Sequence, residues 1–374
     1  MHGTTPGVIS GAMTRRVTNF NPGPATLPLS VLEKTRDELI DFEGTGMSLL
    51  EHSHRGAAYA AVHEEAKSLL KELLGIPDDY HVLFMGGGAT TQFALVPMNL
   101  LDGGSGDYAV TGTWGKKALG EAKVLGGGRV AFDANADGKG FTRVPKQEEL
   151  DLDPKARYLH ITTNNTVAGS QYHYVPKSDA PLVADMSSDI LSRPVDVSKF
   201  GLIYAGAQKN LGPAGVTIVI IKDSLVGEGN KAIPSIFRYR TIVDGDSLQN
   251  TAPTFPIYMV RNVLQWVKAN GGAAGMQKRN DAKGALLYGA IDGNADFYRC
   301  PIERESRSLM NVVFRLPSED LEKKFLAEAA KNELMGLKGH RSVGGIRCSI
   351  YNAMEPAGVE KLVAFMKDFA AKNG

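Results

Sequence analysis

A single lysine, Lys209, stands among small residues in the stretch YAGAQKNLGPAG, between two apolar runs. Its alanine and glycine neighbours leave the side chain little access to water. Loss of hydration favours the neutral amine, which is the form that attacks a carbonyl carbon. The stretch therefore indicates Schiff-base chemistry at Lys209, although an isolated lysine at a turn can also extend its ammonium to solvent.

An aspartate, Asp185, ends an earlier strand-like run in the stretch LVADMSSD. Consecutive strands of a parallel sheet end at the same edge, so we expect Asp185 and Lys209 to face one site there. By itself, Asp185 is equally suited to capping a turn or a helix. A carboxylate paired with a reactive lysine is typical of pyridoxal phosphate, whose ring nitrogen is kept protonated by an acid while its aldehyde carbon bonds the lysine.

A phosphate site is predicted in VLFMGGGATTQF, where a strand, the glycines Gly86 to Gly88 and a helix starting near Ala89 or Thr90 follow one another. Free backbone N–H groups and the helix dipole attract a phosphate there. Glycine-rich turns are common, so this signal is weak alone. Nucleotide binding is less favoured, because Thr91 replaces the third glycine of G-x-G-x-x-G and the chain contains no G-K-S or G-K-T.

Three further side chains have suitable chemistry for the same cofactor. Trp114, in VTGTWGKK, offers an aromatic face that stacks on a planar ring. Thr166, in TTNNTVAG, can donate to the ring hydroxyl, and Gln208 can reach the phosphate. Each also has an ordinary interpretation, as a core tryptophan or as turn residues.

Two short stretches, HSHRG and GHRSVGGIR, are rich in cationic donors. These donors are His54, Arg55, His340, Arg341 and Arg347. The planar arginine fork suits carboxylate and phosphate oxygens, and histidine adds a donor. Any one of them would be unremarkable on a protein surface, but their grouping predicts an anion-binding site.

The elements that must position these residues follow a clear order. Strand-like runs alternate with glycine turns and helical segments, which predicts an α/β fold with a largely parallel sheet covered by helices on both faces. Long helical stretches follow residue 250, and the chain ends as strand, helix, strand, helix. We therefore predict a disordered extension over residues 1–17, a large cofactor-binding domain over 18–265 and a small C-terminal α/β domain over 266–374.

Composition narrows the class of protein. Of the 374 residues 43% are hydrophobic and 22% charged, and 42 basic side chains nearly balance 41 acidic ones, as in globular proteins. The balance gives no reason to expect nucleic acid or a membrane as the main partner. Two cysteines, Cys300 and Cys348, are too few for a disulfide framework, so we expect a cytoplasmic protein. No metal site is predicted.

Several longer stretches carry a family resemblance. FNPGPATLP, EHSHRG, GGGATTQF, the run from ADMSSD to VTIVII, NTAPTF and GHRSVGGIRCSIYNAM resemble the phosphoserine aminotransferases, which are fold-type I pyridoxal-phosphate enzymes of aminotransferase class V. The resemblance runs from about residue 18 to the C-terminus. It implies a homodimer that transfers the amino group of L-glutamate to 3-phosphohydroxypyruvate, giving O-phospho-L-serine and 2-oxoglutarate in serine biosynthesis. It leaves open a second activity of the bacterial family, formation of 4-phosphohydroxy-L-threonine in pyridoxine biosynthesis.

The resemblance also implies a role for each cofactor residue. Lys209 would bind the cofactor and move the substrate proton, Asp185 would hold the ring nitrogen, and Trp114 and Thr166 would contact the ring. The groups that would hold the phosphate are the backbone at Ala89 and Thr90, the Gln208 side chain, and Asn250 and Thr251 of the neighbouring subunit. Some family members carry an arginine at the position of Thr90, so this chain would rely there on backbone groups and a hydroxyl.

For the substrate, the resemblance implies that Arg347 binds the α-carboxylate. The residues implied for the distal anion, partly from the second subunit, are His54, Arg55, His340 and Arg341. An alanine-specific relative would have no use for so many distal cations. A cysteine desulfurase needs a mobile thiol, which the contexts of Cys300 and Cys348 do not suit.

Two alternatives lie outside that class of enzymes. An aldolase that forms a Schiff base without cofactor would explain Lys209 but neither Asp185 nor the glycine turn. A non-catalytic phosphate-binding protein would explain the glycine turn but not the lysine. Both would lack the visible absorption band of a lysine-bound cofactor.

Overall fold

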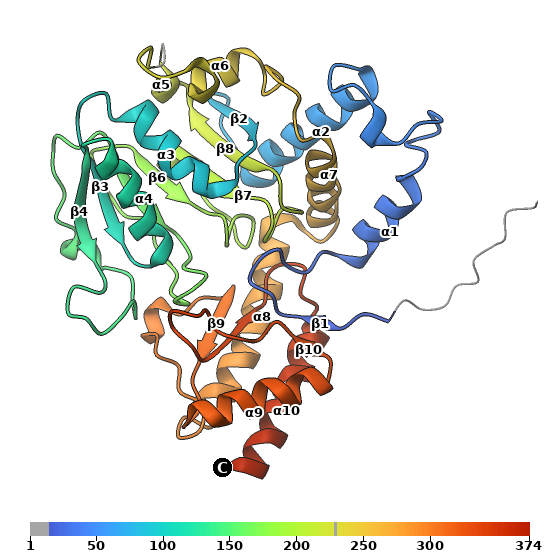
Figure 1. The fold of residues 1–374 in the computed structure, drawn as a ribbon, viewed down its shortest axis with the longest axis vertical. Coiled ribbons are helices and arrows are strands. Elements are labelled where there is room, and N and C mark those ends of the chain that lie inside the picture. The colour runs from blue at the N-terminus through green and yellow to red at the C-terminus, as the bar shows by residue number, and fades with distance from the viewer. Residues whose placement is uncertain (1–14, 228–229) are drawn as a thin grey trace, which may run out of the picture.

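The computed structural model describes residues 15–227 and 230–374, which form a larger and a smaller unit connected through a long helix (Figure 1). Most of the predicted disordered extension, residues 1–14, lies outside the described residues. The strands of the larger unit form one sheet: β2 (Tyr80–Met85), β3 (Gly106–Val110), β4 (Gly128–Asp133), β5 (Leu159–Thr162), β6 (Leu182–Asp185), β7 (Leu202–Gly206) and β8 (Thr217–Lys222).

The order of strands in this sheet is β2-β8-β7-β6-β5-β3-β4. Strands β4, β3, β5, β6 and β7 run parallel, and β8 runs antiparallel to both of its neighbours. The predicted α/β fold with a largely parallel sheet is confirmed. In the parallel register Thr162 pairs with Asp185, and Asp185 pairs with Tyr204, so the carboxyl ends of β5, β6 and β7 meet at one edge.

Helices cover both faces of the sheet (Figure 1). The helices of the larger unit are α1 (Leu29–Glu38), α2 (Ala57–Leu74), α3 (Gly88–Leu100), α4 (Thr113–Val124), α5 (Asp223–Val226), α6 (Tyr239–Asp244) and α7 (Thr254–Ala269). Alternate side chains of one strand enter different cores: Leu202 and Tyr204 pack with α3 and α4, whereas Ile203 and Ala205 pack with α2 and α7. Burial on both faces explains why these strands are continuously apolar.

Three helix boundaries differ from the sequence-based expectation. The amphipathic spacing of LSVLEKTRDELIDF predicts a helix over 29–42, but this helix ends at Glu38, because Phe42 folds back and donates its N–H to the Met47 carbonyl oxygen. The stretch HEEAKSLLKELLGI predicts a helix from residue 63, but this helix already begins at Ala57. The helix after the glycine turn begins at Gly88 rather than at Ala89 or Thr90.

The smaller unit has its own hydrophobic core. Its elements are α8 (Gly272–Asp292), β9 (Asn311–Phe314), α9 (Glu319–Lys331), β10 (Leu334–Met335), β11 (Ile346–Ser349) and α10 (Pro356–Asn373), with β1 (Thr18–Asn19) paired to β10. The first core reaches Met276 and the smaller one includes Leu287, so both share α8. The division after residue 265 stays a prediction.

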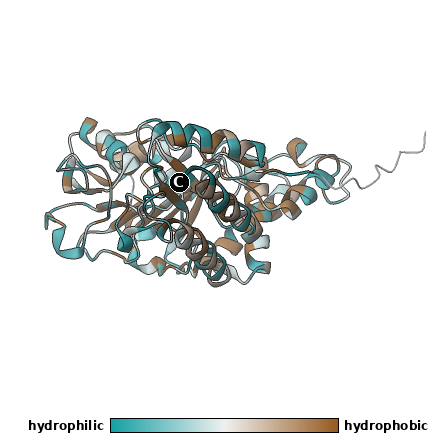
Figure 2. Cartoon of the chain, turned by 90° about the horizontal axis from the view of Figure 1, so that it is seen from below, coloured by the Kyte–Doolittle hydropathy of each residue, from teal (hydrophilic) through white to brown (hydrophobic). Residues whose placement is uncertain are grey.

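Hydropathy follows this packing, with hydrophobic residues inside and hydrophilic residues on the outer turns of the helices and in the loops (Figure 2). Within the described parts of the chain, none of the helices combines the length and the hydropathy needed to cross a membrane.

Candidate active site

A cavity of about 270 Å³ opens at the edge of the sheet where β6 and β7 end. Its lining joins these strand ends to the start of α3, the start of α4 and the smaller unit. The predicted site residues that it brings together are Ala89, Thr90, Trp114, Thr166, Asp185, Gln208, Lys209, His340 and Arg347. Sequence reasoning did not assign a role to other lining residues, among them Gly23, Phe93 and Ser187.

Lys209 lies just after β7 with its side chain half-buried. Its Nζ donates a hydrogen bond to Thr166 Oγ1 at 2.7 Å. Burial lowers the pKa of Lys209 to about 8, although the carboxylates of Asp185 and Asp189 oppose the shift. Near neutral pH Lys209 therefore holds more neutral amine than an exposed lysine does, and the neutral amine is the form that Schiff-base chemistry requires.

Asp185 ends β6 and is buried. Its Oδ1 accepts hydrogen bonds from the backbone N–H and the hydroxyl of Ser187, at 2.9 and 2.6 Å. Its Oδ2 accepts no hydrogen bond from the described residues and is left for a group in the cavity. Burial raises the pKa of Asp185, whereas the charge of Lys209 and then the bonds from Ser187 act to lower it.

Ser187 fixes the orientation of that carboxylate. Its Oγ accepts a hydrogen bond from the Gly206 N–H at 3.0 Å. Because an amide N–H only donates, the hydroxyl proton is left to point at Asp185. Ser187 thus connects the end of β6 to the end of β7, three residues before Lys209. The only sequence signal was a serine two positions after the aspartate in ADMSSD.

The glycine turn has the geometry of a phosphate cradle. Gly87 and Gly88 have φ values of 87° and 71°, in the left-handed region that favours glycine. A Cβ at Gly87 would lie 2.2 Å from Thr91 Oγ1. No side chain caps α3, so the N–H groups of its first turn, at Ala89 and Thr90, remain available to an anion.

Arg347 reaches the cavity from β11 of the smaller unit and is 7% exposed. Its Nη1 donates to the Thr166 carbonyl oxygen at 3.2 Å, and its buried Nε has no partner. Burial lowers the pKa of Arg347. Among the described residues it forms no ion pair with a carboxylate, and a buried cation of this kind is stabilised by an anionic ligand.

Two other predicted residues of the cavity are Trp114 and Gln208. Trp114 lies at the start of α4, half-buried, and its Nε1 is buried without a hydrogen-bond partner. Gln208 lines the cavity beside Lys209. Nearby, a Cβ at Gly23 would lie 3.3 Å from Lys209 Cγ, so the NPGP stretch passes close against the reactive lysine.

The remaining predicted residues lie outside this cavity. Arg341 lines a second cavity of about 660 Å³ that shares Trp114, Val167 and His340 with the first. Asn250 and Thr251 are exposed and line a third cavity, on the other side of the glycine turn.

The His54 and Arg55 pair lines none of these three cavities. His54 is half-buried and Arg55 is exposed. Within a single chain, the structure therefore does not bring the HSHRG stretch to the lysine.

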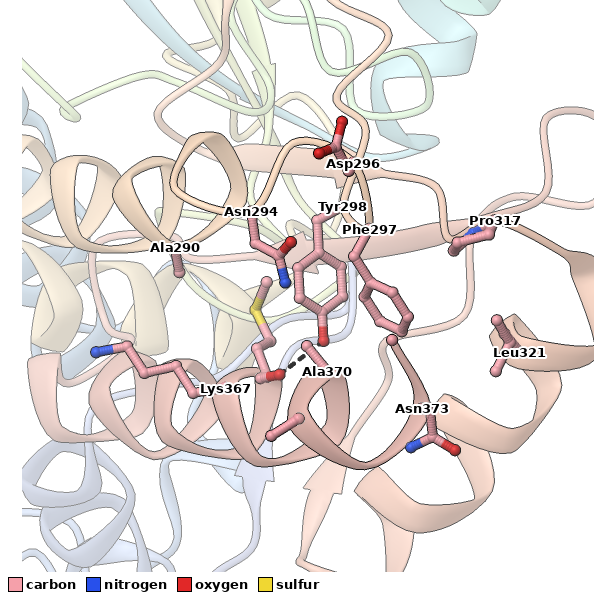
Figure 3. Close-up of a pocket in the computed structure, with 13 residues that line it drawn as sticks. Ala290, Asn294, Asp296, Phe297, Tyr298, Pro317, Leu321, Lys367, Ala370 and Asn373 are labelled. Carbon is pink, nitrogen blue, oxygen red and sulfur yellow. Dashed lines mark hydrogen bonds between the residues drawn. The ribbon is translucent and has the colours of Figure 1, made fainter.

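A larger cavity, of about 700 Å³, lies in the smaller unit between the end of α8 and the end of α10 (Figure 3). It is mainly apolar, and Tyr298 closes one side by donating its hydroxyl to the Met366 carbonyl oxygen at 2.8 Å (Figure 3). Its Lys367 and Asp296 lie on different sides (Figure 3). Without a buried lysine and carboxylate pair, this cavity offers no comparable chemistry.

One group of potential metal ligands occurs in the described part of the chain. His63, Glu64 and Asp246 bring ligand atoms within 4.8 Å of one another. The Lys67 ammonium donates to Asp246 at 2.5 Å and would compete with a cation for that carboxylate. The group is better explained as an ion pair.

The cavity at the sheet edge fits pyridoxal phosphate. The free Oδ2 of Asp185 suits a protonated ring nitrogen, Lys209 suits the aldehyde carbon, and the uncapped first turn of α3 suits the phosphate. These three features lie in one cavity, as predicted from their separate sequence signals. The individual residue roles stay predictions.

Comparison with known proteins gives a consistent result. The family model "Aminotransferase class-V" matches residues 17–362. The phosphoserine aminotransferase of Desulfosudis oleivorans is 55% identical over 365 residues, covering 97% of this chain and 100% of that protein. The solved phosphoserine aminotransferase from Bacillus circulans subsp. alkalophilus is 51% identical with a TM-score of 0.94, covering 96% of this chain and 99% of that one. The solved enzyme from Trichomonas vaginalis, with bound PLP, is 37% identical with a TM-score of 0.90, covering 94% of this chain and 100% of that one.

Proposed function

This chain belongs to the class-V aminotransferases and, within them, to the phosphoserine aminotransferase family, and we propose that it transfers an amino group between L-glutamate and 3-phosphohydroxypyruvate. The products are 2-oxoglutarate and O-phospho-L-serine, in serine biosynthesis. The observation that carries the proposal is the single cavity that contains Lys209, the free oxygen of Asp185 and the unpaired guanidinium of Arg347.

Pyridoxal phosphate is the cofactor that these residues would hold. Lys209 Nζ would bind its carbon, Asp185 Oδ2 its ring nitrogen and Thr166 Oγ1 its ring oxygen. Trp114 would stack on the ring. The phosphate ligands would be the N–H groups of Ala89 and Thr90 and the Gln208 side chain. When bound, the cofactor accepts the amino group and withdraws electrons from the substrate Cα.

The chain itself supplies orientation and proton transfer. Arg347 binds the α-carboxylate, which both substrates share, and so directs the Cα toward Lys209. Lys209 Nζ removes the Cα proton of glutamate as a general base, which its lowered pKa of about 8 favours. In the second half-reaction the same Nζ returns a proton to the Cα of the new amino acid. Asp185, oriented by Ser187, would present its free Oδ2 to the ring side of the cavity.

We further propose that the active unit is a homodimer. His54, Arg55, Asn250 and Thr251 lie outside the cavity of their own chain. In a dimer they would reach the site of the neighbouring subunit, where the first pair binds the distal anion of the substrate and the second pair the cofactor phosphate. A cytoplasmic location is proposed with it, because Cys300 and Cys348 are both free thiols.

Complementation tests the homodimer. The variants Lys209→Ala and Arg55→Ala, each weakly active alone, are co-expressed and the mixed dimer is purified with two different tags. If Arg55 serves the opposite site, one site of each mixed dimer has both residues intact and activity returns. If Arg55 serves its own site, no activity returns.

The reaction is tested by the visible spectrum of the purified protein with pyridoxal phosphate. O-phospho-L-serine should remove the lysine-linked absorption band at concentrations where L-serine and L-alanine do not. Equal responses to L-alanine and O-phospho-L-serine would support the proposed cofactor but contradict the proposed substrate. A coupled assay with the four-carbon phosphorylated keto acid decides whether the pyridoxine-pathway activity is also present.

A further inference from the structure

The cavity that adjoins the cofactor site is strongly cationic. It has a volume of about 660 Å³ and shares Trp114, Val167 and His340 with the site itself. The cationic or titratable side chains in its lining are Lys116, Lys117, Lys139, His340 and Arg341. No aspartate or glutamate is among the residues that line it. A cavity of this kind attracts an anion and is next to the place where the reacting carbon must lie.

Lys117 is the lysine of this cavity that is best placed to meet a ligand. It lies one helical turn after Trp114 on α4, and its Nζ is 4.8 Å from the centre of the Trp114 ring. Lys117, unlike Lys116, is also among the cations whose charge lowers the pKa of His340. In the part of the chain that the structure describes, Lys117 has no acidic partner, whereas Lys139 pairs with Asp137 at 3.0 Å.

His340 supplies a hydrogen bond to this cavity rather than a charge. Its Nδ1 accepts the Ser342 backbone N–H at 3.2 Å, which requires an unprotonated Nδ1. Burial and the nearby cations Arg347, Arg341 and Lys117 lower the pKa of His340 from its usual value of 6.5. At neutral pH the imidazole is therefore mainly neutral, and the positive charge near it comes from Arg347, Arg341 and Lys117.

The two proposed substrates differ in what they require of these cations. A carboxylate has two oxygens and one charge, which a single arginine fork satisfies. A phosphate monoester has three terminal oxygens and a charge of about −1.5 to −2 at pH 7. A phosphate can therefore accept from a further cation in addition to Arg341 and, in the proposed dimer, Arg55 of the neighbouring subunit.

We propose that Lys117 is a specificity residue whose ammonium binds the phosphate group of the phosphorylated substrate and contributes little to the binding of glutamate. The proposal rests on the proposed function, because it assumes that both substrates react at Lys209. Lys117 thereby distinguishes the two half-reactions, whereas Arg347 serves both.

The test uses the holoenzyme and three variants. Lys117→Gln removes the charge, Lys117→Arg restores a cation, and Lys123→Gln is the matched control, since Lys123 is an exposed lysine of α4 outside the cavity. Dissociation constants for O-phospho-L-serine and L-glutamate are measured from the change in the visible cofactor band. Because Lys117 contacts Trp114, cofactor retention is measured separately for each variant.

In Lys117→Gln we expect the dissociation constant for phosphoserine to rise about tenfold at low salt and that for glutamate to change less than about twofold. Lys117→Arg should restore most of the phosphoserine affinity, and Lys123→Gln should behave as the wild type. Added salt should reduce the difference, since exposed charges are screened.

Equal weakening of both ligands, or no change in either, would overturn the proposal. A wild-type protein that retains its band but does not respond to phosphoserine at all would instead reject the proposed function. The two failures are therefore distinguishable.

Discussion

The site has two regions that are built differently. In the floor, formed by Thr166, Asp185, Ser187 and Lys209, each side chain has a hydrogen-bond partner within the protein: Lys209 donates to Thr166, and Ser187 joins Asp185 to the Gly206 N–H. The rim, formed by Lys117, His340 and Arg341, is half-buried or exposed, and in the described structure its two permanent cations have no acidic partner.

The contrast separates two tasks. Chemistry at a carbon atom requires groups held in fixed positions, and the sheet edge supplies them. Recognition of a charged group requires cations that are not already paired, and the rim supplies them. Substitutions in the floor should therefore change the spectrum and the rate, and substitutions in the rim should change affinity.

The largest effect is expected at Lys209, in the floor. Lys209→Ala removes the proposed proton-transfer group and should lower the transamination rate by about 10³-fold or more. The lysine-linked absorption band should be absent, whereas the temperature of thermal unfolding should change little. A variant that keeps both the band and the rate would show that Lys209 is not the proton-transfer group. The floor would then no longer differ from the rim in function.

Arg347 links the two regions, because it is buried like the floor but unpaired like the rim. Arg347→Gln should raise KM for both L-glutamate and O-phospho-L-serine by about 30-fold or more, since a buried charged contact to the shared α-carboxylate is lost. Steady-state kinetics with each substrate measures this. An effect on one substrate alone would assign Arg347 to the rim.

Ser187 should show a smaller effect that is specific to the floor. Ser187→Ala removes one hydrogen bond to Asp185 Oδ1 and leaves the Gly206 N–H unpaired. We expect the dissociation constant of pyridoxal phosphate to rise about tenfold, because hydrogen bonds to charged groups contribute about 1.5–3 kcal/mol. Cofactor titration followed by absorbance measures it.

The neighbouring serine provides the control. Ser188 is also buried and exchanges hydrogen bonds with Asn164, but it does not bond Asp185. Ser188→Ala should lower the thermal stability without changing the affinity for the cofactor. If both variants weaken the cofactor equally, the effect is loss of packing rather than orientation of the carboxylate.

The floor was easier to predict than the rim for a physical reason. Lys209, Asp185 and the glycine turn each carry a local signal, because small neighbours, a strand end and consecutive glycines restrict the backbone directly. The parallel order of the strands then brings these three features together. The strands could be predicted because their sequences are short β-branched runs. The exact helix ends were missed because tertiary contacts, such as the folding back of Phe42, decide them.

The rim and the supporting residues carry no comparable signal. Lys117 is one of several lysines on an exposed helix, and only its position over Trp114 distinguishes it. The sequence does not distinguish Ser187 from other serines. Its role follows from the Gly206 N–H, which donates to Ser187 Oγ and leaves the hydroxyl proton for Asp185. The distance of His54 and Arg55 from the lysine of their own chain is a property of tertiary structure, which spacing along the chain does not contain.

The smallest effect is expected from the pH dependence of His340, in the rim. Its pKa is lowered, so the imidazole gains its proton only below the usual value of 6.5. Between pH 7 and 8 the charge of His340 therefore stays nearly constant. Over this range the phosphoserine affinities of the wild type and of His340→Gln should differ by a constant factor of about a few-fold. This factor corresponds to the loss of about one neutral hydrogen bond. A difference that instead grows steadily as the pH falls from 8 to 7 would mean that His340 binds the phosphate as a cation, and the rim would then have a third charge beside those of Lys117 and Arg341.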